Sequence, residues 1–154
     1  MKSSKLYYSA NLKDIKSSIT PNGYFILKLT SGNAHKWHEL IQKCIDAFNK
    51  QVEWEDMWDF QDALIRFEEG HIMFVYVKTK KVKEDPIGYV WFDKDYLYNM
   101  FMTKSRVKGH TVKFVSAACH SLDMDINNIH LHCDDWNIAA QKMFRKVGFK
   151  IIEK

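Results

Sequence analysis

One short basic segment, residues 105–111 (SRVKGHT), carries the residue types best suited to bind an anion. Arg106, Lys108 and His110 supply side-chain donors, and Gly109 lets the backbone approach a ligand closely or adopt a positive φ. An amphipathic run follows directly, so the segment is expected to open a helix. The first N–H groups of a helix have no intrahelical partner, and together with the helix dipole they favour phosphate. The segment is therefore a candidate phosphate site.

A second candidate site lies in the alternating segment 129–134 (IHLHCD), where His130, His132 and Asp134 share one face. Histidine can accept a proton near neutral pH, so His132 and Asp134 are candidate catalytic residues. The alternative is that these side chains are exposed or hydrogen-bonded structural residues. The H-x-H spacing also resembles a pair of zinc ligands, but no third ligand follows at a local spacing and Cys133 points to the other face. We therefore predict no metal site.

Residues 51–59 (QVEWEDMWD) combine carboxylates with two tryptophans. This composition can attract and hold a cationic amine through charge and cation–π contacts. The alternative is that Trp58 belongs to the core and that the acidic residues complement the dipole at the start of a helix. Both interpretations stay open at this point.

Length and composition predict one globular domain over residues 1–154, because 46% hydrophobic and 14% aromatic residues suffice for one sizeable core. A net charge of +4 with plentiful acidic residues does not require a nucleic-acid partner. The three cysteines are widely spaced in apolar patterns, which favours reduced thiols and an intracellular, cytoplasmic protein. No stretch is long and apolar enough for a signal peptide or a membrane span, so no membrane partner is expected.

The apolar periodicity predicts an α/β fold with the element order β-α-α-β-β-β-α-β-α-β. Residues 1–20 show no clear period and are interpreted as an irregular N-terminal arm or extra element. An antiparallel hairpin followed by strand–helix–strand units predicts a mixed sheet with helices on both faces. Strands are expected at 24–30, 71–78, 87–94, 96–104, 129–134 and 149–154, and helices at 37–48, 56–69, 111–124 and 136–147.

Two stretches resemble motifs of the GNAT superfamily of acyl-CoA-dependent N-acyltransferases. Residues 106–111 (RVKGHT) resemble the pyrophosphate loop R/Q-x-x-G-x-G/A, and residues 137–149 (NIAAQKMFRKVGF) are similar to N-x-x-A-x-x-x-Y-x-K-x-G-F. The resemblance covers about residues 24–154 and includes the element order. It implies a GNAT-like fold and transfer of an acetyl group from acetyl-CoA to a primary amine of a small molecule or protein. In this family the amine attacks directly, through a tetrahedral intermediate.

The resemblance also implies roles for individual residues. The strand before the loop and the strand after the following helix splay apart, and the pantetheine arm lies between them. A backbone N–H near Met102 is the expected oxyanion donor, and Asn137 is expected to bond or orient the pantetheine. The implied catalytic residues are thus Met102, with His132 and Asp134 as the candidates named above, and the implied cofactor-binding residues are Phe101, Met102, Lys104, Arg106, Val107, Lys108, Gly109, His110, Thr111, Asn137 and Phe144.

Two positions depart from the family pattern. Thr111 replaces the second small residue of the loop, and Phe144 replaces the tyrosine that protonates the leaving thiolate in many members. General acid catalysis is typically worth about 10²–10⁴-fold, so its loss slows transfer without abolishing it. One alternative is therefore a module that binds acyl-CoA without catalysis. A less favoured one is a nucleic-acid-associated protein that uses the lysines at 78–83.

The sequence stops at Lys154, before the closing strand that most family members have. We therefore expect the edge of the last strand to be covered by residues 1–20 or by another subunit, as in a homodimer.

Overall fold

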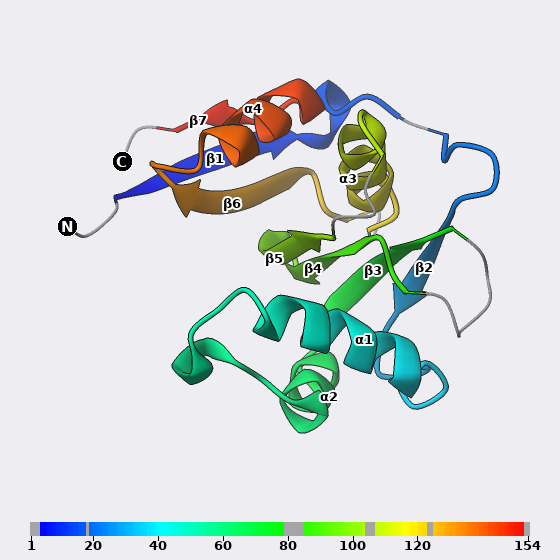
Figure 1. The fold of residues 1–154 in the computed structure, drawn as a ribbon. Coiled ribbons are helices and arrows are strands. Elements are labelled where there is room, and N and C mark those ends of the chain that lie inside the picture. Colours follow the sequence, from blue (N-terminus) through cyan, green and yellow to red (C-terminus); the bar gives the residue numbers. More distant parts are fainter. Residues whose placement is uncertain (1–3, 18, 79–84, 104–106, 123–124, 153–154) are drawn as a thin grey trace.

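The computed structural model describes residues 4–17, 19–78, 85–103, 107–122 and 125–152. Within these ranges the chain forms a seven-stranded sheet flanked by helices (Figure 1). The strands are β1 (Lys5–Asn11), β2 (Phe25–Leu29), β3 (Ile72–Val77), β4 (Gly88–Asp93), β5 (Tyr96–Met102), β6 (Asn128–Asp134) and β7 (Lys150–Ile151). The α-helices are α1 (His38–Asn49), α2 (Phe60–Glu68), α3 (His110–His120) and α4 (Ile138–Val147), and the 3-10 helices are η1 (Leu12–Asp14) and η2 (Trp54–Asp56).

The sheet has the strand order β2-β3-β4-β5-β6-β1-β7 and is antiparallel except between β5 and β6. Figure 1 shows α1 and α2 on one face and α3 and α4 on the other. Each pair of helices closes its own core, one built around Trp91 and Phe67 and the other around Phe114 and Phe149. The predicted mixed sheet with helices on both faces is confirmed.

The apolar patterns explain which strands are covered on both faces. Every residue of β3 after Ile72 is buried, because α1 and α2 pack on one side and α3 on the other. In β6, by contrast, Ile129 and Leu131 are buried while His132 is exposed. This alternation places the histidine face of β6 on the side of α1 and α2.

The N-terminal segment adds a strand to the predicted element order. An irregular arm or an extra element was expected, and Lys5–Asn11 forms an extra strand, β1, which pairs along its whole length with β6. The strand is held because Tyr8 and Ala10 alternate into the core with exposed fractions of 0% and 4%. β1 also pairs with β7, through Tyr8 and Ile151, so one edge of the last strand is covered by a part of the N-terminal segment, as expected.

Several boundaries differ from the prediction for local reasons. Helix α2 begins at Phe60 rather than Asp56, because Asp59 and Asp62 form a reciprocal capping box. Helix α1 begins at His38, one residue later than expected, because Trp37 is its N-cap residue and has no helical conformation (φ −105°, ψ 26°). A strand over 149–154 was expected, and in the described part of this range β7 comprises Lys150–Ile151; residues 153 and 154 lie outside the described residues.

Candidate functional site

The gap between β5 and β6 is the feature around which the candidate site is built. Among the described residues, these parallel strands are paired in register only at Tyr96 and His130, where the His130 N–H donates to the Asp95 carbonyl at 2.9 Å. Further along, Phe101 and Met102 remain paired with β4 on one side but are not paired with β6 on the other. The strands therefore separate toward their C-terminal ends, which leaves an edge of β5 backbone that an extended ligand can meet.

Gly88 on β4 lets β5 lie close at this point. It sits directly opposite Met102. A Cβ at position 88 would overlap the Met102 side chain and would lie 2.7 Å from the Phe101 carbonyl oxygen. The glycine thus sets the position of the two β5 residues predicted to contact the cofactor.

The described part of the basic segment lies at the start of α3, as predicted. Gly109 is the N-cap residue and has a φ of 86°, a left-handed conformation that glycine adopts without strain. Val107 and Lys108 are exposed, and Thr111 is half-buried. Lys104 and Arg106 lie outside the described residues, so their predicted contacts are not placed.

His110 is held by two tyrosines that the sequence did not single out. The Tyr76 hydroxyl lies 2.9 Å from His110 Nδ1, and the Tyr24 ring meets the imidazole edge-on at 4.6 Å. Burial raises the pKa of Tyr76 to about 12, so its phenol stays protonated and can donate to Nδ1. A neutral imidazole then carries its hydrogen on Nε2, where it can donate to an anion at the start of α3.

Asn137 lies at the start of helix α4 and caps it, whereas Phe144 lies within the helix and is buried. Asn137 is the N-cap residue, and its side-chain oxygen accepts from the Ala140 N–H at 3.1 Å. Phe144 is only 5% exposed and packs edge-on against Phe149, with ring centroids 5.8 Å apart. Phe144 is therefore a core residue of this structure, whatever further contact it makes with a ligand.

His132 and Asp134 lie together on the open face of β6, beside β1. The imidazole of His132 lies between the rings of Tyr7 and Tyr96, at centroid distances of 5.8 and 5.7 Å, and its Nδ1 is hydrogen-bonded to the Tyr96 hydroxyl. Lys5 forms a 2.7 Å salt bridge with Asp134. Desolvation by these neighbours lowers the pKa of His132, the Lys5 charge lowers it further, and the Asp134 carboxylate raises it.

The carboxylate and tryptophan segment forms part of a pocket, which has a volume of about 560 Å³. Trp58 lines this pocket and also packs on Trp91, with centroids 5.1 Å apart, so it belongs both to the core and to the pocket wall. Trp54, in contrast, is 76% exposed. The other lining residues come from α1, η2, α2, β5 and the segments beside them, and are Phe48, Asp56, Met57, Asp62, Ile65, Arg66, Glu69, Tyr98 and Asn99.

A β-bulge brings β5 into this pocket. Trp91 pairs with Asn99 and Phe92 with Leu97, so Tyr98 is an extra residue in β5. The Arg66 guanidinium carbon lies 5.3 Å from the centre of the Tyr98 ring. The pocket is therefore walled by α2 on one side and by the strand of the gap on the other.

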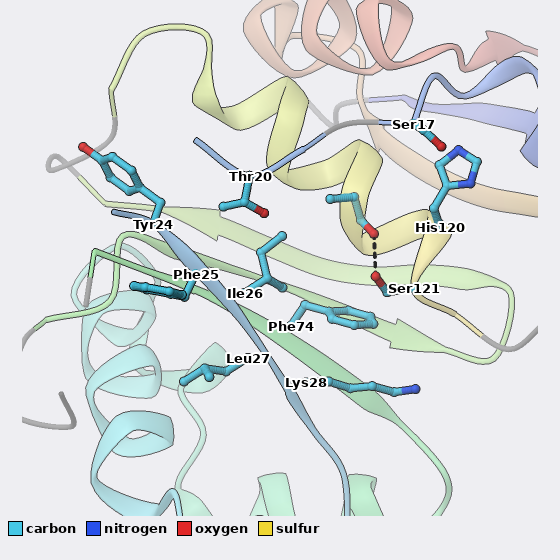
Figure 2. A pocket seen from close by; sticks show the side chains of 11 residues that line it. Ser17, Thr20, Tyr24, Phe25, Ile26, Leu27, Lys28, Phe74, His120 and Ser121 are labelled. Carbon is cyan, nitrogen blue, oxygen red and sulfur yellow. Dashed lines mark hydrogen bonds between the residues drawn. The ribbon is translucent and has the colours of Figure 1, made fainter. Parts of the chain in front are cut away.

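A larger pocket, of about 690 Å³, contains none of the predicted site residues (Figure 2). It lies along β2 and the C-terminal end of α3, with Ile26 and Phe74 among its apolar side chains and Lys28 at one end. The Ser121 hydroxyl beside it already donates to the Ala117 carbonyl at 2.8 Å. Size alone therefore does not locate the candidate chemistry in this chain.

The described residues also bear on metal binding and on membrane crossing. No cluster of three or more histidine, cysteine, aspartate or glutamate side chains among them could hold a metal ion. None of the helices in the described ranges is long and apolar enough to cross a membrane. Of the hairpin lysines, only Lys78 is described, and it is exposed.

Comparison with known proteins identifies the class of fold. No family model and no curated protein matches the sequence. Among solved structures, a GNAT-family acetyltransferase from Colwellia psychrerythraea is similar over 97% of this chain and 53% of its own, with a TM-score of 0.60 and 18% identity. An aminoglycoside acetyltransferase from an uncultured soil metagenomic sample is similar over 84% of this chain and 90% of its own, with a TM-score of 0.59 and 13% identity.

A tandem GNAT protein from the clavulanic acid biosynthesis pathway matches 97% of this chain, with a TM-score of 0.62 and 9% identity. This chain spans 50% of that protein's length, and it likewise spans 50% of the first solved structure it matches, a Drosophila protein. The chain therefore has the fold of the GNAT acetyltransferases, as its two motifs predicted. At these identities the likeness establishes the fold, and the activity is a separate question.

Proposed function

We propose that this chain is an N-acetyltransferase that transfers an acetyl group from acetyl-CoA to a primary amine. The observation that supports the proposal most directly is the gap between β5 and β6, whose described residues pair only at Tyr96 and His130. At its C-terminal end β5 leads to the loop before α3, and through Tyr98 and Asn99 it lines the pocket beside α2. One strand thus connects a candidate cofactor site with a candidate acceptor site.

The residues present fit acetyl-CoA. Its pyrophosphate would be held at the start of α3, where the left-handed Gly109 caps the helix and the exposed Lys108 and His110 Nε2 can meet phosphate. The edge of β5 at Phe101 and Met102 that faces the gap would hold the pantetheine arm. When bound, acetyl-CoA supplies an activated acetyl thioester.

Transfer of the acetyl group requires a proton acceptor for the amine and a hydrogen-bond donor for the acetyl oxygen, and residues beside the gap could provide both. In the reaction the amine nitrogen bonds to the acetyl carbon, the carbon–sulfur bond breaks, and the amine loses a proton. His132 would accept that proton, because its lowered pKa keeps the imidazole neutral at neutral pH. A backbone N–H near Met102 would stabilise the negative charge on the acetyl oxygen. Phe144 has no proton to give, so the thiolate would be protonated by water or by the imidazolium.

The pocket beside α2 supports a cationic acceptor. Among its described lining residues, the carboxylates Asp56, Asp62 and Glu69 outnumber the one cation, Arg66, whose guanidinium already lies over an aromatic ring. Its aromatic walls offer faces on which an ammonium group can rest. We therefore propose an amine acceptor, free or on a peptide, that carries additional positive charge.

The test is an acetyl-transfer assay that measures free CoA thiol with polyamines, aminoglycosides, amino acids and peptides as acceptors. We expect turnover with the cationic acceptors, a fall in kcat of about 10²-fold for His132→Ala, and a higher KM for cationic acceptors in Asp56→Asn. The matched control is Asp14→Asn, which removes an exposed carboxylate of η1 outside the pocket. Turnover without preference for cations would exclude the acceptor class, and no turnover with any amine would exclude the activity.

A second candidate function is a module that binds acyl-CoA without transferring the acyl group. The observation in its favour is the burial of Phe144, which puts a ring without a hydroxyl where many GNAT enzymes have the proton donor. This hypothesis predicts saturable acetyl-CoA binding, lost in Asn137→Ala, with no release of thiol in the presence of any amine. Homodimerisation remains a prediction from sequence.

A further inference from the structure

The hydrogen bond between Tyr96 and His132 connects two strands that otherwise separate. In the described part of the chain, β5 pairs with β6 at Tyr96, whose partner is His130. His132 lies two residues after His130 in β6. Their contact therefore spans the start of the gap, on the face shared with the pocket beside α2. A side-chain bond at this point holds the imidazole at the start of the gap.

The ring of His132 is confined from two directions. Tyr7 lies opposite it in the register of β1 and β6, and its ring is tilted by 48° to the imidazole. The Tyr96 ring lies on the other side, tilted by 43°. An exposed histidine without such contacts would sample several rotamers, and ordering it later would cost free energy. Here the two tyrosines hold the ring before any ligand arrives.

Charged and titratable groups face the imidazole from each neighbouring strand. Lys5 and Tyr7 belong to β1, Tyr96 to β5, and Asp134 to β6 itself. Lys5 and Asp134 are bonded to each other at 2.7 Å, so their opposite charges largely offset one another near the ring. Burial raises the pKa of Tyr96, so its phenol keeps its own hydrogen, and its oxygen can either donate to Nδ1 or accept from Nδ1–H, depending on the tautomer of His132. Desolvation and the Lys5 charge lower the pKa of His132 and so favour the neutral imidazole, while the Asp134 carboxylate opposes them.

We propose that Tyr96 and Tyr7 are positioning residues for His132, with the Tyr96 oxygen accepting a hydrogen bond from Nδ1–H so that Nε2 is the nitrogen that takes the proton from the amine. This inference rests on the proposed acetyl transfer. It extends the site to the N-terminal strand, since Tyr7 comes from β1.

Only this tautomer keeps the bond through the whole reaction. When the amine gives up its proton, Nε2 gains it and the imidazole becomes an imidazolium with a hydrogen on each nitrogen. Nδ1–H donates to the Tyr96 oxygen both before and after that step. In the other tautomer the phenol donates to Nδ1, and the imidazole could take up a proton only at the nitrogen already engaged, so the bond would have to reverse.

Nitrogen NMR of the full chain labelled with ¹⁵N-histidine tests the proposal without any substrate. Long-range ¹H–¹⁵N correlations at about pH 8, where an ordinary histidine side chain is neutral, reveal which ring nitrogen carries the hydrogen, and a His132→Gln variant assigns the signal. We expect the hydrogen of His132 on Nδ1 in the unaltered chain and on Nε2 in Tyr96→Phe. The matched control is Tyr98→Phe, which removes a hydroxyl from the same strand and should leave the His132 tautomer unchanged.

The proposal would be overturned if His132 carried its hydrogen on Nε2 in the unaltered chain. It would also be overturned if the Tyr96→Phe variant and the unaltered chain gave identical His132 spectra. In the transfer assay we expect Tyr96→Phe to lower kcat on the order of 10-fold with the KM for acetyl-CoA unchanged, because it displaces the base and not the cofactor. The predicted tautomer in a chain that acetylates no amine would contradict the proposed function alone. The Nε2–H tautomer in an active enzyme would contradict the positioning role alone.

Discussion

At the scale of single residues, Lys5 and Asp134 shift the pKa of His132 in opposite directions. Lys5→Met removes the cation that disfavours protonation, so the pKa of His132 should rise. Asp134→Asn removes the anion that favours it, so the pKa should fall. NMR titration of the His132 ring protons measures both shifts, with Lys13→Met as a control for loss of a lysine elsewhere. If the pKa of His132 shifted in the same direction in both variants, the opposite effects of Lys5 and Asp134 would be contradicted.

His71 should make stability depend on pH. It is 4% exposed, it accepts a 2.7 Å hydrogen bond from Trp91 Nε1, and burial lowers its pKa below the usual value. Well above about pH 6.5, the ordinary pKa of a histidine side chain, His71 is neutral in both the folded and the unfolded chain. As the pH falls through that value, the unfolded chain binds a proton that the folded chain resists, so His71 reduces stability progressively.

The corresponding variant is His71→Asn, whose side-chain oxygen can still accept from Trp91. We expect this variant to have a lower melting temperature than the unaltered chain at pH 7.5. Between pH 7.5 and pH 5.5, however, its melting temperature should fall by less than that of the unaltered chain. Thermal unfolding at both pH values measures the difference. Equal losses in the two proteins would show that His71 does not carry this pH dependence.

At the scale of elements, the contact between β4 and β5 controls the gap. Gly88→Ala puts a Cβ against the Met102 side chain and 2.7 Å from the Phe101 carbonyl oxygen, so β5 must move. Overpacking of this kind typically costs about 1–3 kcal/mol of folding free energy. We expect a lower melting temperature and a higher KM for acetyl-CoA. Gly32→Ala is the control, because the nearest atom to its Cβ would be the Thr30 hydroxyl oxygen at 3.6 Å, an ordinary contact.

At the same scale, periodicity predicted most elements and missed one. The alternation in residues 129–134 was enough to put His132 and Asp134 on one face, since side chains in any strand alternate. β1 was missed because its tyrosines and serine give weak apolar alternation, and it becomes a strand only through pairing with β6. The partners of His132 could not be predicted for the same reason: Tyr96 lies 36 residues away in the sequence, and Tyr7 lies on that missed strand.

At the scale of the whole molecule, the candidate site combines parts of the chain that local patterns treat separately. The positive φ of Gly109 could be predicted because it depends on a few neighbouring residues, whereas Asn137 was expected to bond or orient the pantetheine and its capping bond was not predicted. The pocket beside α2 is lined both by residues of the segment 51–59 and by Tyr98 at the bulge. No local sequence pattern indicated the bulge, so the complete lining of the pocket could not be predicted. The sheet brings these pieces together, so local patterns could not indicate this lining, and the cofactor contacts stay predictions.

Because the proposed cofactor site draws on α3, β5 and α4 at once, acetyl-CoA should stabilise the whole fold. A ligand at 100 times its Kd adds about 2.7 kcal/mol to the free energy of unfolding, which for a chain of this size raises the melting temperature by roughly 5–10 °C. Gly109→Ala should abolish most of this shift, because alanine is strained at a φ of 86°. Gly32→Ala should retain it. An equal shift in both variants, or none in the unaltered chain, would show that the start of α3 does not hold the cofactor.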